Sequence, residues 1–394
     1  MSGNLVALSE IAEVKLGRQR SPKNHNGDQM RPYVRAANVG WNGLKLDDVK
    51  TMNFTDAEMR IYRLLPGDIL LGEASGSAAE VGKPAIWAGQ IENCGFQNTL
   101  IRVRPRGADS RYLLHYFAHC AASGLFARRS RGVGIFHLGR KALAEWPIPI
   151  PPIEEQRRIA AVLDAADALR AKRREALAKL DTLTQAIFID MFGDPVANPK
   201  GWPVVRIGEA LASATYGTSK KAGRAGEFAV LRMGNLTGDG RLDLTDLKYI
   251  DLEGRELDNH LAHSGDVLFN RTNSAELVGK TAVYRGSEPI AYAGYLVRLR
   301  PGDRLDAEYL GAFMNLRTTK QTLRAMCKSI VGMANINAKE VQTIEMPLPP
   351  VDLQRSFASA RERSAVRRRS MESQAAQFDT LFAALQQRAF RGEL

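Results

Sequence analysis

Two long stretches of the chain carry apolar residues at steps of three and four, the spacing of one face of a helix. The first stretch follows Pro152 and contains no glycine or proline before Gly193. At about 38 residues it would form a helix roughly 57 Å long. The apolar positions make a heptad seam, interrupted at Arg173, that consists of Ile159, Val162, Ala166, Leu169, Ala176, Leu180, Leu183 and Ile187.

The second stretch repeats the first after about 198 residues and has a more polar seam. Its apolar positions include Phe357, Met371, Phe378, Leu381 and Leu385. We expect the two helices to pair with each other. If they lie antiparallel, each globular part emerges at an opposite end of the pair, and the repeat acquires a pseudo-two-fold axis.

A short motif introduces each helix. Pro151-Pro152, Gln156 and Arg157 return as Pro349-Pro350, Gln354 and Arg355. Proline suits the first turn of a helix, where a missing N–H costs nothing. Further anchors recur at nearly the same distance, among them Gly67-Asp68-Ile69-Leu70 with Gly265-Asp266-Val267-Leu268 and Val81-Gly82-Lys83 with Val278-Gly279-Lys280. The chain is therefore a duplicated unit that consists of a globular part and a helix. The two copies share the anchor motifs, whereas the polar residues between the anchors differ.

The globular parts mix short β-rich runs with one helical stretch each. The helical stretches are residues 110–127 and 306–325, and the β-rich runs include 69–71, 85–87, 100–103, 267–269, 281–284 and 296–299. Turn signals such as Pro66-Gly67-Asp68 separate the runs, which predicts an α+β fold. The predicted division is a globular domain over 1–148, a helix over 149–193, a second globular domain over 194–346 and a second helix over 347–394.

Composition and charge narrow the function. The 394 residues are 44% hydrophobic and 25% charged, as in an ordinary globular protein. A net charge of +12 favours a polyanionic partner, above all nucleic acid, although a solubility role would give the same excess. Cys94, Cys120 and Cys327 are too few and too scattered for a disulfide framework or a closed zinc site, which indicates a reducing cytoplasm. No signal peptide or long apolar run is evident, so neither secretion nor membrane insertion is expected.

Several polar loops are candidates for DNA contact. Tyr216 and Gly217 precede Thr218, Ser219, Lys220 and Lys221, a combination suited to phosphates and base edges. The counterpart around Gly17 contains Arg18, Gln19 and Arg20. An ordinary exposed loop would look the same.

A second group of candidates follows the β-rich runs. Arg reads guanine and Asn reads adenine by paired hydrogen bonds, which draws attention to Arg271, Asn273 and Ser274 and to Ser75 at the matching place. The remaining candidates are Lys83, Lys280, Arg128, Arg129, Arg131 and Lys328. Any of them could instead cap a strand or bridge a carboxylate.

Motifs for catalysis are missing from the sequence. It contains no Walker loop, no dinucleotide-binding fingerprint and no nucleophile elbow. Asn198-Pro199-Lys200 only approaches the motif of amino-methyltransferases, and Glu13-Val14-Lys15 has no upstream acid to complete a magnesium site. His115 and His119 share a helix face without a third ligand and are interpreted as packing residues. We expect no catalytic residue, no metal site and no cofactor bound by this chain.

The order of globular part, Pro-Pro-led helix, globular part and Pro-Pro-led helix resembles the specificity subunit of type I restriction-modification systems over the whole chain. The matching segments are 148–160, 216–222, 270–274 and 277–281. Val351-Asp352-Leu353 departs from the pattern, since the first boundary has Ile153-Glu154-Glu155.

The resemblance implies two target-recognition domains, each reading one half of a split double-stranded DNA site. It also implies an antiparallel coiled coil that fixes the gap between the half-sites. Two methyltransferase subunits would dock alongside, supply adenine methylation and hold S-adenosylmethionine, and translocating restriction subunits would cleave. The alternative hypothesis is a coiled-coil scaffold without DNA specificity.

Overall fold

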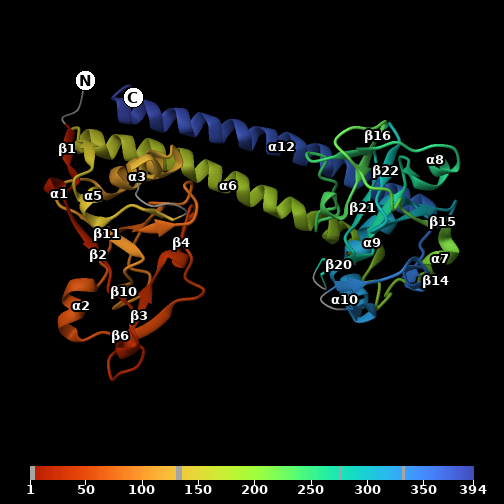
Figure 1. The fold of residues 1–394 in the computed structure, drawn as a ribbon, viewed down its shortest axis with the longest axis horizontal. Helices are drawn as coiled ribbons and strands as arrows, with labels where there is room; N and C mark the ends of the chain where they lie inside the picture. The colour runs from red at the N-terminus through yellow and green to blue at the C-terminus, as the bar shows by residue number, and fades with distance from the viewer. Residues whose placement is uncertain (1–4, 130–134, 275–276, 331–332) are drawn as a thin grey trace. The chain divides into compact units, whose positions relative to one another are not determined.

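The computed structural model describes residues 5–129, 135–274, 277–330 and 333–394. These form two compact units: unit 1 combines two stretches that are distant in sequence, Met1–Arg173 and Gln374–Leu394, and unit 2 is the continuous stretch Arg174–Ser373. Each unit combines helices with β-sheets (Figure 1), so the predicted mixed character is confirmed. The predicted four-part division of the chain stays a prediction.

Both long helices form where the sequence predicts them. Helix α6 spans Ile153–Phe192 and starts directly after the double proline, and α12 spans Val351–Arg391 after the second double proline. Helix α6 ends before Gly193, whose φ of 83° lies in the left-handed region that glycine adopts without strain. Each helix begins in one unit and ends in the other.

Unit 1 is built on an antiparallel sheet in the order β2-β11-β7-β9, beside a smaller sheet in the order β10-β3-β6. The strands of these sheets are β2 (Ala12–Leu16), β11 (Leu100–Pro105), β7 (Ile69–Gly72), β9 (Pro84–Ile86), β10 (Gly95–Phe96), β3 (Met30–Val34) and β6 (Lys50–Asn53). Shorter pairs are β1 (Leu5–Ala7) with β13 (Pro147–Pro149), β4 (Val39–Gly40) with β5 (Gly43–Leu44), and β8 (Ala74–Ser75) with β12 (Phe136–His137). The short helices are α1 (Leu8–Ile11), α2 (Asp56–Tyr62), α3 (Ser110–Ala122), α4 (Leu125–Arg129) and α5 (Arg140–Ala144).

Unit 2 repeats this plan, with sheets in the orders β15-β23-β19-β21 and β17-β16-β22-β18. Their strands are β15 (Leu211–Tyr216), β23 (Leu296–Pro301), β19 (Val267–Asn270), β21 (Thr281–Val283), β17 (Lys248–Ile250), β16 (Phe228–Leu231), β22 (Ile290–Tyr292) and β18 (Leu261–Ala262). The strands β14 (Val204–Arg206) and β26 (Glu345–Pro347) pair, as do β20 (Thr272–Asn273), β25 (Met333–Asn335) and β24 (Lys328–Ile330) in that order. The short helices are α7 (Ile207–Ala210), α8 (Arg255–His260), α9 (Ala307–Asn315), α10 (Arg317–Met326) and α11 (Ala338–Gln342).

The β-rich runs are strands in the structure, but each predicted helical stretch is two helices. Residues 110–127 divide at Gly124, which has a φ of 71° and separates α3 from α4. Residues 306–325 divide at Leu316, whose extended backbone (φ −63°, ψ 147°) separates α9 from α10. Apolar spacing continues through both breaks, which is why the sequence pattern did not reveal them.

Buried polar contacts explain why the double-proline motif recurs with its glutamine. Gln156 accepts a hydrogen bond from the backbone N–H of Asp109 at 2.9 Å and donates to the carbonyl of Pro151 at 2.8 Å. Gln354 makes the same two bonds with Asp306 and Pro349, at 2.8 and 2.7 Å. Each glutamine thereby ties the start of a long helix to the start of α3 or α9. Both side chains are buried, so losing either would leave unpaired backbone groups.

An ion pair in each unit explains why the Gly-Asp motif recurs. Asp68 pairs through both carboxylate oxygens with Arg104, at 2.7 and 2.8 Å, and Asp266 pairs in the same way with Arg300, at 2.8 and 2.7 Å. The two aspartates are almost wholly buried. A two-point arginine pair fixes the direction of both groups, which holds the turn before β7 or β19 against the central strand of its sheet.

In unit 1, the C-terminal part of α12 packs against α3 and the first half of α6. The ring of Phe390 lies 5.6 Å from that of Tyr112, and the ring of Phe382 lies 6.3 Å from that of His115. Arg158 bonds to the carbonyl of Leu394, and Arg170 pairs with Asp379. These pairings join low residue numbers in α6 to high ones in α12, so the two segments run antiparallel in this unit.

The predicted seam does not coincide with the buried rows of the long helices. Ile159 and Phe357 are buried as predicted, and Ala166, Leu180, Ile187, Met371 and Leu385 are half-buried. Val162, Leu169, Leu183, Phe378 and Leu381 are exposed, which corrects the prediction at these positions. Leu163 and Phe188, each one residue further along, are fully buried instead. The heptad pattern assumed that only the partner helix covers the seam, whereas α3 and α9 also pack against these helices.

His115 and His119 belong to this packing. His115 is 5% exposed, contacts a carboxylate oxygen of Asp164 at 2.6 Å and faces Phe382. The ring of His119 lies 5.5 Å from that of Phe390. Burial lowers the pKa of His115, although the hydrogen bond to Asp164 opposes that shift. Both rings lie against α12, in agreement with their interpretation as packing residues.

Candidate DNA interface

The loop after β15 is shaped by a close backbone approach at Gly217. A Cβ atom there would lie 2.2 Å from the carbonyl oxygen of Tyr292, and one at the equivalent Gly17 would lie 2.2 Å from that of Gln97. Thr218 then pairs with Ala293 in a parallel bridge. Only glycine permits this approach, which explains its recurrence at both places. The loop is thereby held against its sheet, with Ser219, Lys220 and Lys221 exposed.

Arg271 connects this loop to two other segments of unit 2. Its guanidinium lies 4.9 Å from the ring centroid of Tyr216 and donates to Asn335 at 3.3 Å. Its backbone N–H donates to the carbonyl of Tyr295, and its carbonyl accepts from Ile336. Three polar segments that lie far apart in the sequence therefore meet around one half-buried arginine.

The segment after Arg271 joins a small antiparallel sheet. Thr272 and Asn273 of β20 pair with Asn335 and Ala334 of β25, and β25 pairs in turn with β24, which begins at Lys328. Ser274, just beyond β20, is exposed. The structure thus places Arg271, Asn273 and Ser274 beside the β-hairpin that contains Lys328. The side chain of Lys328 lies outside the described residues.

Basic side chains gather around Gly279 in unit 2. The Nζ of Lys320 donates to the carbonyl of Gly279, and Lys280 and Arg324 lie close enough to act on its charge. Burial, and then these two like charges, lower the pKa of Lys320 from 10.5 to about 7. A phosphate beside this cluster would be attracted by three cationic groups and would favour the charged form of Lys320.

The lowered pKa of half-buried Lys320 leads to a specific pH dependence of stability. As pH rises through 7, folded Lys320 loses its proton while the unfolded side chain, with its ordinary pKa near 10.5, keeps it. The unfolded state then binds more protons, so stability increases with pH. Between pH 7 and 8.5, the wild type should gain on the order of 1 to 2 kcal/mol in free energy of unfolding relative to K320M. Urea titrations across this range measure the difference; K221M, which alters an exposed lysine, should follow the wild type. Parallel curves for wild type and K320M would contradict the assignment.

In unit 1, the loop after β2 is held by its own arginine. Arg18 pairs with Glu58 at 2.5 Å, donates to the carbonyl of Asn53 and lies over the ring of Phe54. The side chain is only 17% exposed. Gln19 and Arg20, which follow it, are exposed. Arg18 therefore stabilises the loop, while Gln19 and Arg20 remain accessible for contact.

The other candidates of unit 1 lie on two further surfaces. Ser75 is half-buried in β8, which pairs with β12. Arg128 and Arg129 are exposed at the end of α4, and the guanidinium of Arg129 lies 4.8 Å from the ring centroid of Trp146. Arg131 lies outside the described residues. The segments of Ser75 and of the α4 arginines thus correspond to those of Asn273 and Lys328 in unit 2.

The structure corrects one predicted DNA contact, that of Thr218, and shows that two other predicted residues, Lys83 and Lys220, form ion pairs within the protein. Thr218 is 5% exposed and its hydroxyl accepts from the backbone of Lys220, so it shapes the loop and is not accessible to DNA. Lys83 pairs with Glu80 and lies 5.9 Å from the ring centroid of Trp41. Lys220 pairs with Glu256 at 2.5 Å. The two lysines are available to a phosphate only if they exchange these partners.

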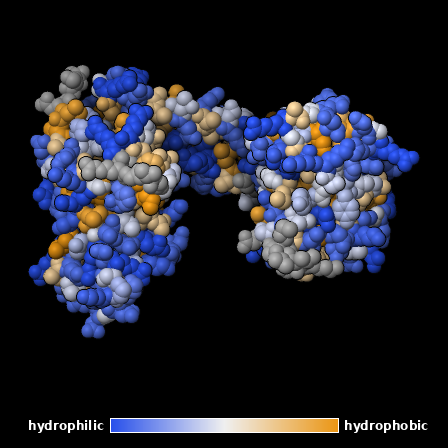
Figure 2. Space-filling view, viewed as in Figure 1, coloured by the Kyte–Doolittle hydropathy of each residue, from blue (hydrophilic) through white to orange (hydrophobic). Residues whose placement is uncertain are grey.

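Exposed aromatic side chains are the group that sequence reasoning missed. Tyr216 is 43% exposed, Tyr295 54% and Trp41 44%, and each lies beside a candidate arginine, lysine or loop. The sequence does not distinguish these rings from core aromatics, and only the fold shows that they are exposed. In Figure 2, hydrophilic residues cover most of the visible face of each unit, as expected for a polar partner.

Known proteins that are similar to this chain include DNA specificity domains and subunits. The family described as type I restriction modification DNA specificity domain matches residues 4–179. The type I restriction enzyme EcoKI specificity subunit of Escherichia coli (strain K12) is 25% identical over 397 residues, which cover 94% of this chain and 84% of the relative. The chain is thus similar to type I restriction-modification specificity subunits over nearly its whole length.

A second specificity subunit and a solved structure show a similarity of the same extent. The StySPI specificity subunit of Salmonella potsdam is 25% identical over 396 residues, covering 94% of this chain and 84% of the relative. A chain from a solved structure concerned with complex assembly and conformational transition of the type I R-M system matches with a TM-score of 0.64 and 20% identity. That match covers 100% of this chain and 99% of the solved one, and it shows a shared fold.

The described residues of this chain hold no cluster of three or more His, Cys, Asp or Glu side chains that could bind a metal ion. Burial raises the pKa values of the Cys94 and Cys120 thiols to about 12, so neither is a reactive thiolate at neutral pH. No helix in the described part of the chain is long and apolar enough to cross a membrane.

Proposed function

We propose that the chain is the DNA-recognition subunit of a type I restriction-modification complex and binds a bipartite double-stranded target. The observation that carries the proposal is the meeting of three polar segments around Arg271 in unit 2. Unit 1 presents the corresponding segments with different side chains. The two sites share a backbone fold but carry different polar side chains. Recognition of two different DNA sequences requires such a difference.

Each unit would recognise the bases of its half-site through accessible residues and would bind the DNA phosphate backbone through Lys and Arg side chains. In unit 2, Ser219, Lys221, Asn273 and Ser274 are accessible, and Lys280, Lys320 and Arg324 form a basic cluster nearby in the fold. In unit 1, Gln19, Arg20, Arg128 and Arg129 are accessible. Phosphate contacts position a protein on DNA and base contacts select the sequence, so both kinds of group are needed.

The long helices would form an antiparallel coiled coil that sets the gap between the two words. The antiparallel pairing of α6 with α12 in unit 1 supports this role. Two methyltransferase subunits would dock on the chain and bring S-adenosylmethionine with them, and restriction subunits would join the complex. This chain would contribute recognition and positioning, and its partners would contribute catalysis.

Methylome sequencing of the host, with the gene intact and deleted, tests the proposal. We expect a methylated motif of two short words separated by a fixed run of unspecified bases, and we expect it to disappear on deletion. A plasmid copy should restore it. An unchanged methylome, together with DNA binding by the purified chain that does not weaken as salt rises, would favour the alternative of a protein scaffold.

A further inference from the structure

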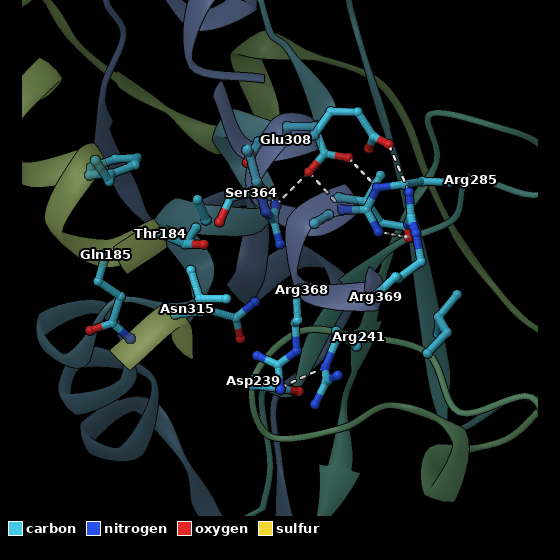
Figure 3. A pocket seen from close by; sticks show the side chains of 18 of the residues that line it. Thr184, Gln185, Asp239, Arg241, Arg285, Glu308, Asn315, Ser364, Arg368 and Arg369 are labelled. Carbon is cyan, nitrogen blue, oxygen red and sulfur yellow. Dashed lines mark hydrogen bonds and ion pairs between the residues drawn. The ribbon is translucent and has the colours of Figure 1, made fainter. Parts of the chain in front are cut away.

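Unit 2 contains a cavity of about 630 Å³ beside the two long helices, separate from the loops around Arg271. Its lining includes Leu180, Thr184 and Phe188 of α6, Ala312 and Asn315 of α9, and Arg368 of α12. Figure 3 labels Thr184, Asn315 and Arg368 around this space. A volume of this size is within the range of pockets that hold ligands. None of these residues belongs to the proposed DNA surface.

The repeat shows what occupies the equivalent space in unit 1. Thr184 corresponds to Phe382 and Arg368 to Arg170, at the distance that relates the double-proline motifs. Ala312 corresponds to His115, since Tyr309 and Tyr112 make the same bond to Pro347 and Pro149. In unit 1 the guanidinium of Arg170 lies 4.3 Å from the ring centroid of Phe382, and the His115 ring packs edge-on against the same ring. Two rings in unit 1 are thus replaced by a threonine and an alanine in unit 2, which leaves the cavity.

The cation that covers the ring in unit 1 is retained in unit 2. Arg368 bonds to Glu372 at 2.8 Å and lines the cavity. Such a bond does not prevent stacking, because Arg170 pairs with Asp167 and Asp379 while it covers Phe382. Arginine over an aromatic face is attracted by the ring's electron density. Unit 2 therefore retains the arginine, while a threonine, Thr184, stands at the position that the ring occupies in unit 1.

A buried acceptor adds a second requirement. The side-chain amide of Asn315 donates to the carbonyls of Thr281 and Gly311, each at 2.8 Å, which fixes the direction of its oxygen. No described residue donates a hydrogen bond to that buried oxygen. A buried acceptor without a donor costs free energy until a ligand or water satisfies it. An occupant that carries a polar hydrogen would do so.

We propose that this cavity receives an aromatic side chain with a polar hydrogen, tryptophan or tyrosine, from a partner protein. The ring that fills the space in unit 1 is itself a side chain presented by a helix, which favours a protein occupant. The charged lining favours it too, because Glu308 with Arg285 and Arg361 surrounds the apolar part as polar rims surround anchor residues at protein interfaces. The identity of the partner, a methyltransferase subunit, rests on the proposed function; the chemistry of the cavity does not.

The first experiment titrates the full chain with indole and follows the methyl NMR signals of Leu180 and Ala312. We expect saturable shifts with indole and binding about threefold to tenfold weaker with 1-methylindole, which has the ring without the N–H donor. T184F, which introduces the ring of unit 1, should abolish the shifts, and so should A312H if T184F does not fold. Equal binding of the two indoles, or none, would overturn the proposal.

The second experiment measures association of the full chain with its cognate methyltransferase subunit. T184F should weaken association at least tenfold, whereas T182F, an exposed position on the same helix, should leave it unchanged. Unchanged association with T184F, or an equal loss in both variants, would overturn the proposed docking. If the wild-type chain itself binds no methyltransferase subunit, the proposed function fails, and the indole result still reports on the cavity.

Discussion

Replacing Phe188 by alanine should lower the free energy of unfolding of unit 2 by about 3 to 5 kcal/mol, the usual cost of removing a buried phenyl ring. Phe188 is fully buried at the end of α6. Its ring stacks on that of Tyr309 at 5.2 Å and meets Phe192 at 4.9 Å and Phe357 at 5.6 Å. These four rings join α6, α9 and α12 in unit 2. Phe188 also lines the cavity of unit 2, so its removal would enlarge that space, and a cavity term adds to the lost transfer energy.

Calorimetry of the full chain should show the transition of unit 2 lowered by about 10 °C, and hydrogen exchange can assign that loss to a unit. Amides of α9 should lose protection in F188A while those of α3 in unit 1 keep it. Ile189 is the matched control because it follows Phe188 on the same helix and is 42% exposed. I189A should change stability by less than about 1 kcal/mol, as is usual for surface substitutions. Equal effects from both substitutions would mean that the four rings do not determine the stability of unit 2.

The sequence predicted those elements whose signals are local. Proline-led starts, the stop at Gly193 and the β-rich runs all depend on residues close together in the chain, and the structure has them there. The breaks at Gly124 and Leu316 were not predicted, because the apolar spacing continues through them. A single glycine is a weak signal, since tertiary contacts decide whether a helix continues past it.

The buried face of the long helices could not be read from spacing alone. A heptad pattern predicts the side that faces one partner helix, but Leu163 and Phe188 are buried because α3 and α9 cover a different side. The exposed positions Leu169 and Leu381 fit the pattern equally well and are not covered in this chain. We expect the proposed methyltransferase subunits to cover this apolar surface.

The candidate site was predicted as separate loops, and its coherence comes from the fold. Nothing in the sequence indicates that Arg271 stacks on Tyr216 or that β20 pairs with β25, because both depend on contacts between distant segments. The depressed pKa of Lys320 likewise arises from burial beside Gly279. Residue types identified the kind of partner, while the tertiary contacts separate accessible groups such as Lys221 from structural ones such as Thr218.

Deleting one matched heptad from both long helices should shift the preferred gap between the two DNA words and lower affinity for the original target at least about 100-fold. The blocks 171–177 in α6 and 370–376 in α12 lie at the boundary of the two units. Seven residues remove about 10 Å of helix, the length of about three base pairs. In the original target, only one unit at a time could then engage its word, so the gain from linked binding would be lost.

Three base pairs also turn the duplex by roughly 100°, so the second word would face away from a rigidly shortened chain. The shortened protein should therefore bind its best new target more weakly than the wild type binds its own. Selection from a DNA library with randomised gaps measures both quantities, and the two words themselves should not change. Replacing by alanine the ten of these fourteen residues that are not already alanine keeps the helix length and should keep the gap. An unchanged gap after deletion would exclude the long helices as the element that sets the spacing, even if each unit still read its word.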